Sequence, residues 1–157
     1  MVTINIICTG KIKEKYLKDA IDEYSKRLSK FCKLNILELP DKKIPDKTNS
    51  SIENEIKNIE SEINHLKKDT YVICLDLKGK QFSSEEFAQD IQDISMLHSN
   101  ITFIIGGSLG MSEKLLNLAN QKICFSKMTF PHQLIRVFLL EQIYRAFKII
   151  NGENYHK

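Results

Sequence analysis

The 157-residue sequence lacks the features that mark several large protein classes. No apolar run is long enough to span a bilayer, and the N-terminus has neither the basic segment nor the long apolar segment of a secretion signal. The four cysteines stand singly, without a Cys-x-x-Cys pair, and no histidines or cysteines have the spacing of metal ligands. We therefore expect a soluble cytoplasmic protein with buried, reduced thiols, no metal site and no membrane partner.

A strong charge bias is also absent. The net charge of +3 and the pI near 8.6 exclude a polybasic, histone-like protein but permit an anionic partner. Hydrophobic residues make up 42% of the chain, which is enough for one domain with a substantial core. Because no linker, repeat or low-complexity tract interrupts the chain, residues 1–157 are predicted to form a single domain.

Apolar stretches alternate with amphipathic ones along the chain. Strands are predicted over residues 2–8, 34–39, 71–77, 101–105 and 122–125. Helices are predicted over residues 12–31, 52–66, 83–97, 114–119 and 131–150. Ser83 and Glu86 form a capping box, Ser112 caps the following helix, a polar loop covers 41–51, and Lys78-Gly79-Lys80 ends the third strand. This alternation is typical of an α/β fold with a mostly parallel sheet flanked by helices.

The glycine-rich stretch at residues 106–110 fits neither common nucleotide-binding signature. A dinucleotide fingerprint needs a glycine at position 105, where Ile105 stands, and the Gly-Lys-Ser/Thr of a phosphate loop is missing. Glycines after a strand let a backbone approach a ligand closely, and ligands of open α/β sheets bind at this end of the strands. A purely structural tight turn explains the stretch equally well.

The segment from Phe125 to Ala146 is the most informative part of the chain. Pro131 suits the first position of a helix, and the helix that follows is apolar on nearly every side. Such a helix must be buried within the fold or between two copies of the chain, and its charged residue Arg136 needs a partner. Glu141 and Arg145 have the spacing of a helical ion pair. The pair either ties down the helix or presents Arg145 to an anionic substrate, with Glu141 orienting it.

Other polar residues leave more than one interpretation open. The lysine-rich face of the helix predicted over 12–31 is either a solvated face or a source of phosphate contacts. His132, at the start of the last helix, fits either an anion site or a structural hydrogen bond. The tail at 151–157, which contains His156, is predicted from composition alone to be disordered.

Six segments of the sequence, taken together, match the motifs of a known protein family. They are Ile4–Lys11, Leu75–Lys80, Phe103–Ser108, Phe125–His132, Glu141–Ala146 and Tyr155–Lys157. Together they resemble the RlmH family of SPOUT-class methyltransferases, in register from end to end and most specifically in the C-terminal third. The variable parts fall chiefly between residues 41 and 66, where a loop and a surface helix are predicted.

The resemblance implies a SPOUT-type fold, in which the C-terminal segment threads through a loop to form a deep trefoil knot. It also implies a homodimer that holds S-adenosylmethionine in the knot. The implied product is N3-methylpseudouridine in the 23S rRNA of the large subunit of assembled ribosomes. By position, the implied cofactor contacts are Leu75, Gly106, Phe125, Ser126, Lys127, Met128, Thr129 and Phe130. Three strand ends would then converge on one crevice.

Two residues near the C-terminus are candidates for catalysis. Arg145 is the candidate for binding an RNA phosphate or a base carbonyl. His156, beside Tyr155, is the candidate for shaping the substrate pocket and accepting the N3 proton, and in a dimer this tail could reach the partner's cofactor. Two alternatives are a non-catalytic protein that binds RNA or the ribosome, and a SPOUT methyltransferase that acts on tRNA.

Overall fold

The computed structural model describes residues 1–40, 57, 61, 70–106 and 113–157 of the chain. The loop predicted over 41–51, most of the helix predicted over 52–66, and Ser112 lie outside these residues. Lys57 and Ser61, the two described residues of that helix, are helical as predicted.

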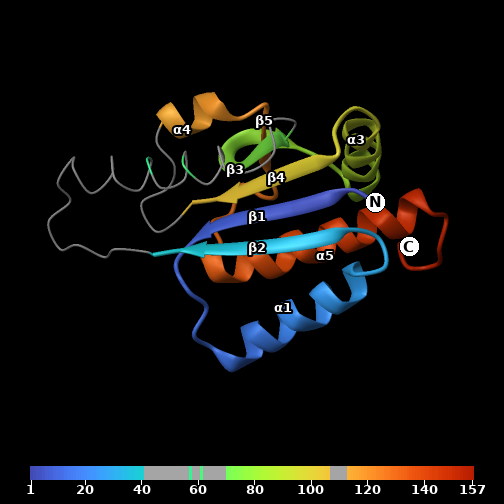
Figure 1. The fold of residues 1–157 in the computed structure, drawn as a ribbon, viewed down its shortest axis with the longest axis horizontal. Coiled ribbons are helices and arrows are strands. Elements are labelled where there is room, and N and C mark those ends of the chain that lie inside the picture. Colours follow the sequence, from blue (N-terminus) through green and yellow to red (C-terminus); the bar gives the residue numbers. More distant parts are fainter. Residues whose placement is uncertain (41–56, 58–60, 62–69, 107–112) are drawn as a thin grey trace, which may run out of the picture.

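Five parallel strands form one sheet within the described residues, in the order β2-β1-β4-β3-β5 (Figure 1). The strands are β1 (Thr3–Thr9), β2 (Lys33–Leu39), β3 (Thr70–Gln81), β4 (Asn100–Ile105) and β5 (Gln121–Cys124). The helices are α1 (Lys15–Leu28), α3 (Ser84–Leu97), α4 (Glu113–Leu118) and α5 (His132–Ile150). The predicted α/β fold with a parallel sheet flanked by helices is confirmed.

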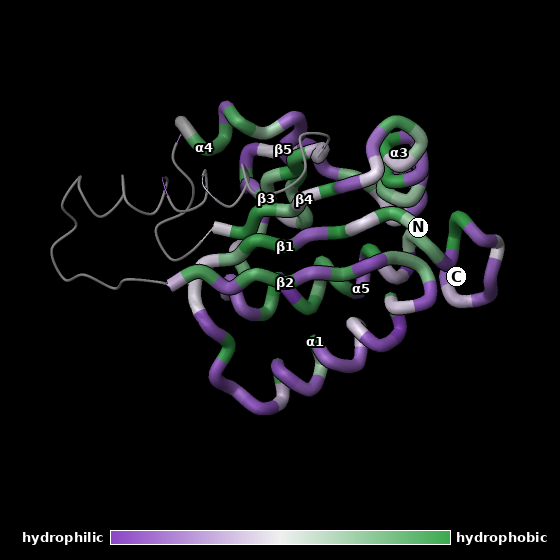
Figure 2. Tube along the Cα trace, viewed as in Figure 1, coloured by the Kyte–Doolittle hydropathy of each residue, from purple (hydrophilic) through white to green (hydrophobic). Residues whose placement is uncertain are grey.

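Different helices cover the two faces of the sheet. On one face, side chains of β1 and β4 such as Ile6 and Phe103 pack into a common core with α1, α3 and α5. On the other face, Leu115 of α4 packs against Val72 and Ile104. Figure 2 shows that hydrophilic residues predominate along α1, whereas α5 and the strands carry many more apolar residues. The central strands β1 and β4 are therefore buried, as expected for parallel strands, whereas the edge strand β2 is mostly exposed.

The apolar helix α5 is buried within the chain. It packs against both α1 and α3, and Leu139, Leu140 and Ile143 are fully buried. Pro131 is its N-cap, one position before the first helical residue His132, so this proline precedes the helix and does not occupy its first position. Of the two ways of burying this helix, the structure shows burial within the fold.

Strand β3 is longer than predicted, and Lys78-Gly79-Lys80 does not end it. The strand continues to Gln81, and after a register shift it pairs with β5 again at Lys80 and Gln81. A Cβ atom on Gly79 would lie 2.6 Å from the backbone carbon of Ile123. This glycine therefore allows two strands to approach closely and does not form the predicted turn.

Helix α1 is shorter than the predicted span of 12–31. Ile12 is buried but lies in the loop before the helix, where its N–H donates to the Glu38 carboxylate at 2.9 Å. Phe31 follows the helix and stacks on Phe147 of α5, with ring centroids 5.7 Å apart. The apolar spacing that suggested a longer helix thus reflects burial of its flanking loops.

Candidate cofactor cavity and active site

The carboxyl ends of β4 and β5 lie beside Leu75 of β3, where the pairing of β3 with β5 is interrupted. Leu75 of β3 pairs with Ile105 of β4 and with Ile123 of β5. The chain therefore leaves the sheet after β4 and β5 at the level of Leu75, although these segments are far apart in sequence. The predicted convergence of Leu75, Gly106 and Phe125 on one crevice is confirmed, because all three line a single cavity.

The cavity at these strand ends has a volume of about 220 Å³. Seven of the eight residues expected to contact the cofactor line it, namely Leu75, Gly106, Phe125, Ser126, Met128, Thr129 and Phe130. Lys127 is the exception, because its side chain is not part of the lining. The run 125–130 thus curves around the cavity with one residue turned elsewhere.

The lining combines apolar surfaces with a few polar groups. Ile105 and Ile135 add to the apolar side chains, and Asp76 and His132 add to the polar ones. Such a lining suits a ligand with a flat ring and several hydrogen-bonding groups. None of these four was among the cofactor contacts predicted from the sequence, although His132 was named there as a possible anion site. For Asp76 a signal was present, because it directly follows a predicted contact at a strand end.

Local hydrogen bonds hold the turn after β5. The Met128 N–H donates to Ser126 Oγ at 3.0 Å, and the Cys124 thiol donates to the Ser126 carbonyl at 3.0 Å. The Phe130 ring packs edge-on against Phe138 of α5, with centroids 5.3 Å apart. These contacts fix the turn against both β5 and α5, so this wall of the cavity is largely formed before a ligand binds.

The predicted ion pair between Glu141 and Arg145 is present on α5. Arg145 Nε donates to Glu141 Oε1 at 2.8 Å, and its guanidinium lies 4.7 Å from the centroid of the Tyr155 ring. The Tyr155 hydroxyl donates to Glu141 Oε2 at 2.8 Å. Burial and a hydrogen bond to Glu141 raise the pKa of the Tyr24 hydroxyl to about 12. Glu141 therefore holds both Arg145 and the tail in place.

The C-terminal tail is ordered, so the prediction of disorder from its composition is wrong. His156 Nδ1 lies 3.2 Å from Arg145 Nη1, and its Nε2 lies 2.6 Å from Glu85 Oε1 on α3. Because a guanidinium can only donate, Nδ1 is the acceptor and Nε2 carries the proton that is donated to Glu85. This hydrogen bond lowers the pKa of the Glu85 carboxyl. Both ring nitrogens of His156 are engaged.

Neither Arg145 nor His156 lines the cavity. His132, at the start of α5, does line it, and Arg145 follows 13 positions later. At 1.5 Å per residue the two positions are roughly 20 Å apart along the helix. Figure 1 shows the C-terminal tail beside the N-terminus, at the end of the molecule opposite the carboxyl ends of the strands. Within one chain, the two candidate groups of site residues are separate.

Arg136, the first arginine of α5, is a structural clamp. Its side chain is only 2% exposed. It donates to Glu38 Oε2 at 2.9 Å, to the Thr9 carbonyl at 2.9 Å and to the Gly10 carbonyl at 2.7 Å. The clamp joins the ends of β1 and β2 to α5 beside the cavity.

Other predicted features concern the cysteines, metals and membranes. All four cysteines are buried and unpaired, and burial raises the pKa of Cys8 to about 11 and those of Cys32 and Cys74 to about 12. In the described part of the chain, no group of three or more metal-ligating side chains could hold an ion. None of the helices described there is long and apolar enough to cross a membrane.

The arrangement is similar to that of two solved methyltransferase structures. A putative methyltransferase from Legionella pneumophila, Lpg2936, in complex with S-adenosylmethionine, matches with a TM-score of 0.53 over 92% of this chain and 66% of its own, at 10% identity. The SpoU methyltransferase AviRb from Streptomyces viridochromogenes matches with a TM-score of 0.50 over 97% of this chain and 59% of its own, at 9% identity. The chain spans less than two thirds of either structure. The chain therefore shares the fold of this class of methyltransferase structures.

Sequence comparison identifies the family within that class. The family model described as "Predicted SPOUT methyltransferase" matches residues 2–156. Relatives from Clostridium acetobutylicum and Clostridium novyi are 57% and 60% identical, over 99% of this chain and 100% of theirs. Both are named ribosomal RNA large subunit methyltransferase H. The chain belongs to the SPOUT methyltransferase family and, within it, to the RlmH family, as its sequence motifs predicted.

Proposed function

We propose that residues 1–157 form a single SPOUT methyltransferase domain that transfers a methyl group from S-adenosylmethionine to N3 of a pseudouridine in 23S rRNA. The enzyme acts as a homodimer, on assembled ribosomes, in the cytoplasm. Full-length relatives at 57% and 60% identity that are named ribosomal RNA large subunit methyltransferase H support this substrate.

The observation that carries the proposal is the cavity at the ends of β4 and β5, beside residues 75–77 of β3. Its apolar surfaces, formed by residues such as Leu75, Phe125 and Ile135, suit the adenine ring and the thioether chain of S-adenosylmethionine. The Asp76 carboxylate and the Thr129 hydroxyl suit its ribose hydroxyls and its ammonium group. The residues present therefore fit both the apolar and the polar parts of the cofactor.

The chemistry required of the protein is alignment, charge stabilisation and proton transfer. S-adenosylmethionine supplies an electrophilic methyl group on a positively charged sulfur. Holding the uracil ring in line with this methyl group supplies up to about 7–11 kcal/mol. Arg145 binds a phosphate or a ring carbonyl of the RNA and stabilises the negative charge that develops when N3 loses its proton. His156 shapes the pocket, and it accepts a proton only after it releases Arg145 or Glu85, because both of its nitrogens are engaged.

A homodimer brings the two groups of residues together. Ile135 is the last residue of α5 that lines the cavity, and Arg145 follows it by roughly 15 Å along the helix, which separates the two groups within a single chain. In our proposal the tail of one subunit, with Tyr155 and His156, reaches the cavity of its partner. The deep trefoil knot belongs to the same proposal, with the run 125–130 and α5 as the threaded segment.

Calorimetric titration with S-adenosylmethionine tests the cofactor site. We expect micromolar binding by the wild type and loss of binding in Gly106→Val, because the valine side chain fills a strand end that lines the cavity. Ala20→Val, which also places a valine side chain on the protein but on α1, away from the cavity, is the control and should bind normally. Absence of binding by the wild type, or normal binding by a folded Gly106→Val, would contradict the proposal.

Mixing two inactive variants tests the shared active site. Gly106→Val lacks a cofactor site, and Arg145→Ala lacks the catalytic arginine. A mixed dimer has one intact site, made of the cavity of the Arg145→Ala subunit and the tail region of the Gly106→Val subunit. Equal mixing with subunit exchange should restore about a quarter of wild-type activity, because half of the dimers are mixed and each has one of two sites intact. No recovery in a verified mixed dimer would place both functions in the same subunit.

A further inference from the structure

A second and larger cleft adjoins the cofactor cavity. It has a volume of about 750 Å³ and lies at the carboxyl ends of β1 and β2. Lys11 and Lys13 line one side of it, and Glu38 and Pro40 line another. His132 lines both this cleft and the cofactor cavity, so the two hollows meet at the start of α5.

The charge of this cleft is positive on balance. Lys11 and Lys13 are exposed, and neither has an ion-pair partner among the described residues. Two carboxylates also line the cleft, from Glu14 and Glu38. The charge of Glu38 is compensated by buried Arg136, whose Nη1 donates to it at 2.9 Å. Two lysines therefore face one uncompensated carboxylate, that of Glu14.

Two helices begin at the cleft and add to this positive potential. Glu14 is the N-cap of α1, and His132 is the first residue of α5. Neither helix has a side-chain hydrogen bond at its N-cap, and neither has an acidic residue in its first turn. The positive ends of the two helix dipoles favour an anion in the cleft.

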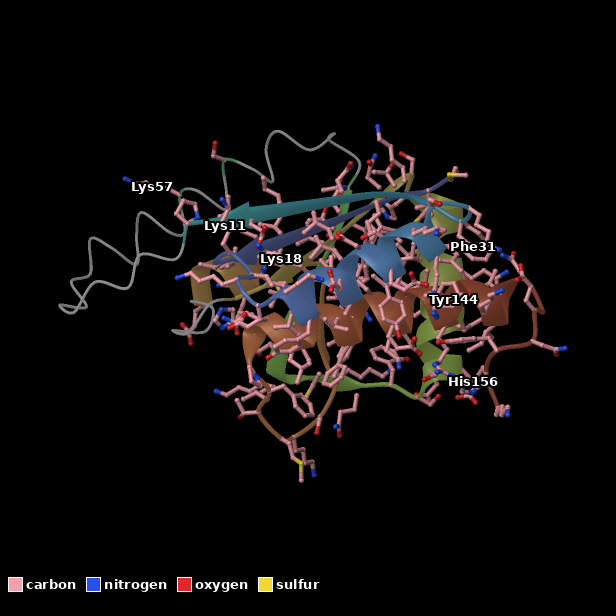
Figure 3. The ribbon with its side chains drawn as sticks, turned by 90° about the horizontal axis from the view of Figure 1, so that it is seen from below. Lys11, Lys18, Phe31, Lys57, Tyr144 and His156 are labelled. Atoms are coloured by element: carbon pink, nitrogen blue, oxygen red, sulfur yellow. The ribbon has the colours of Figure 1, made fainter. Side chains whose placement is uncertain are left out.

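The lysine segment is anchored to the sheet. Gly10 has a φ of 92°, in the left-handed region, and its N–H donates to the Leu39 carbonyl at 2.6 Å. Arg136 donates hydrogen bonds to the Thr9 and Gly10 carbonyls. Figure 3 shows Lys11 close to the carboxyl end of β2. Since the backbone is fixed before binding, less conformational entropy is lost when an anion binds.

We infer that this cleft binds phosphate groups of the RNA strand next to the nucleotide that is methylated, with Lys11 and Lys13 as the contacts. The inference rests on the proposed function. An RNA strand whose base enters the catalytic site must continue across the surface beside it, and the adjoining hollow has lysines and helix N-termini suited to its phosphates. The contacts are electrostatic, so they contribute affinity and register but do not read the sequence.

Charge-matched double variants test this inference. Lys11→Gln/Lys13→Gln removes two charges in the cleft. Lys26→Gln/Lys33→Gln removes two exposed charges at the opposite end of α1 and β2 and is the control. Binding to purified bacterial ribosomes is measured against salt concentration, together with the kinetics of methyl transfer and the affinity for S-adenosylmethionine.

The cleft variant should bind ribosomes roughly tenfold more weakly at physiological salt, and its salt dependence should fall by about one unit of slope per lysine. The KM for ribosomes should rise by a similar factor, with kcat and cofactor affinity unchanged, and the control should match the wild type. Equal ribosome affinity of the cleft and control variants would overturn the inference, as would a loss of cofactor affinity in the cleft variant. If the wild type methylates no ribosomal RNA, the proposed function fails, but the ribosome-binding comparison still decides the role of the cleft.

Discussion

Replacing buried Arg136 by methionine should lower the free energy of unfolding by about 3 kcal/mol or more. The guanidinium makes three hydrogen bonds, to Glu38, Thr9 and Gly10, and its side chain is 2% exposed. Removing one partner of a buried ion pair costs about 3–5 kcal/mol, because the groups left behind lose their partners. The lower end of that range applies, because the Glu38 side chain is 34% exposed and water can solvate its carboxylate.

Urea unfolding at a fixed protein concentration measures this change, since the stability of a dimer depends on concentration. Arg27→Met is the matched control, because it removes a second arginine–glutamate pair that is exposed on α1, and its effect should be much smaller. A double-mutant cycle with Glu38→Gln should show a coupling free energy above about 1 kcal/mol. A folded Arg136→Met within about 1 kcal/mol of the wild type would refute the reasoning.

Two further predictions concern the thiols and Gly79. Burial raises the pKa of the Cys8 thiol to about 11 and those of the Cys32 and Cys74 thiols to about 12, so all three stay protonated at pH 8. Their reaction with a thiol reagent should therefore be slow in the native protein and should become fast as urea unfolds it. Fast labelling of the native protein would contradict this. Gly79→Ala should destabilise the protein by about 1–3 kcal/mol, because the added Cβ meets the backbone of Ile123. The same substitution should weaken cofactor binding, because it displaces β5. An unchanged melting temperature and cofactor affinity would show that β5 can move to accommodate the Cβ without cost.

Local signals in the sequence predicted most of the elements. The strands β1, β2, β4 and β5 lie within one residue of their predicted bounds. The capping box at α3 has both of its hydrogen bonds, from the Ser83 N–H to Glu86 at 2.9 Å and from the Glu86 N–H to Ser83 Oγ at 3.1 Å. Such features depend on residues a few positions apart, so sequence spacing is sufficient to find them.

Features that depend on distant residues were not predictable in this way. Gly79 has the flanking lysines of a turn, and only the position of β5 shows that it permits a close strand contact. The tail has the composition of a disordered segment, but Glu85, 71 positions away, binds His156. For the cofactor cavity, spacing indicated only that ligands bind at strand ends, and the family resemblance supplied the individual residues. Asp76 and His132 lie within two of the quoted motifs, Leu75–Lys80 and Phe125–His132, but were not among the cofactor contacts that the resemblance implied.

The position of the transferred methyl group tests the central claim most directly. Ribosomes that lack the modification are incubated with the enzyme and isotopically labelled S-adenosylmethionine, and the RNA is digested and mapped by mass spectrometry, with deproteinised 23S rRNA and tRNA in parallel. Our account predicts label on N3 of a pseudouridine of 23S rRNA, only when assembled ribosomes are the substrate. Label on tRNA would identify a different SPOUT methyltransferase, and no label from a protein that binds both cofactor and ribosomes would contradict an enzymatic role.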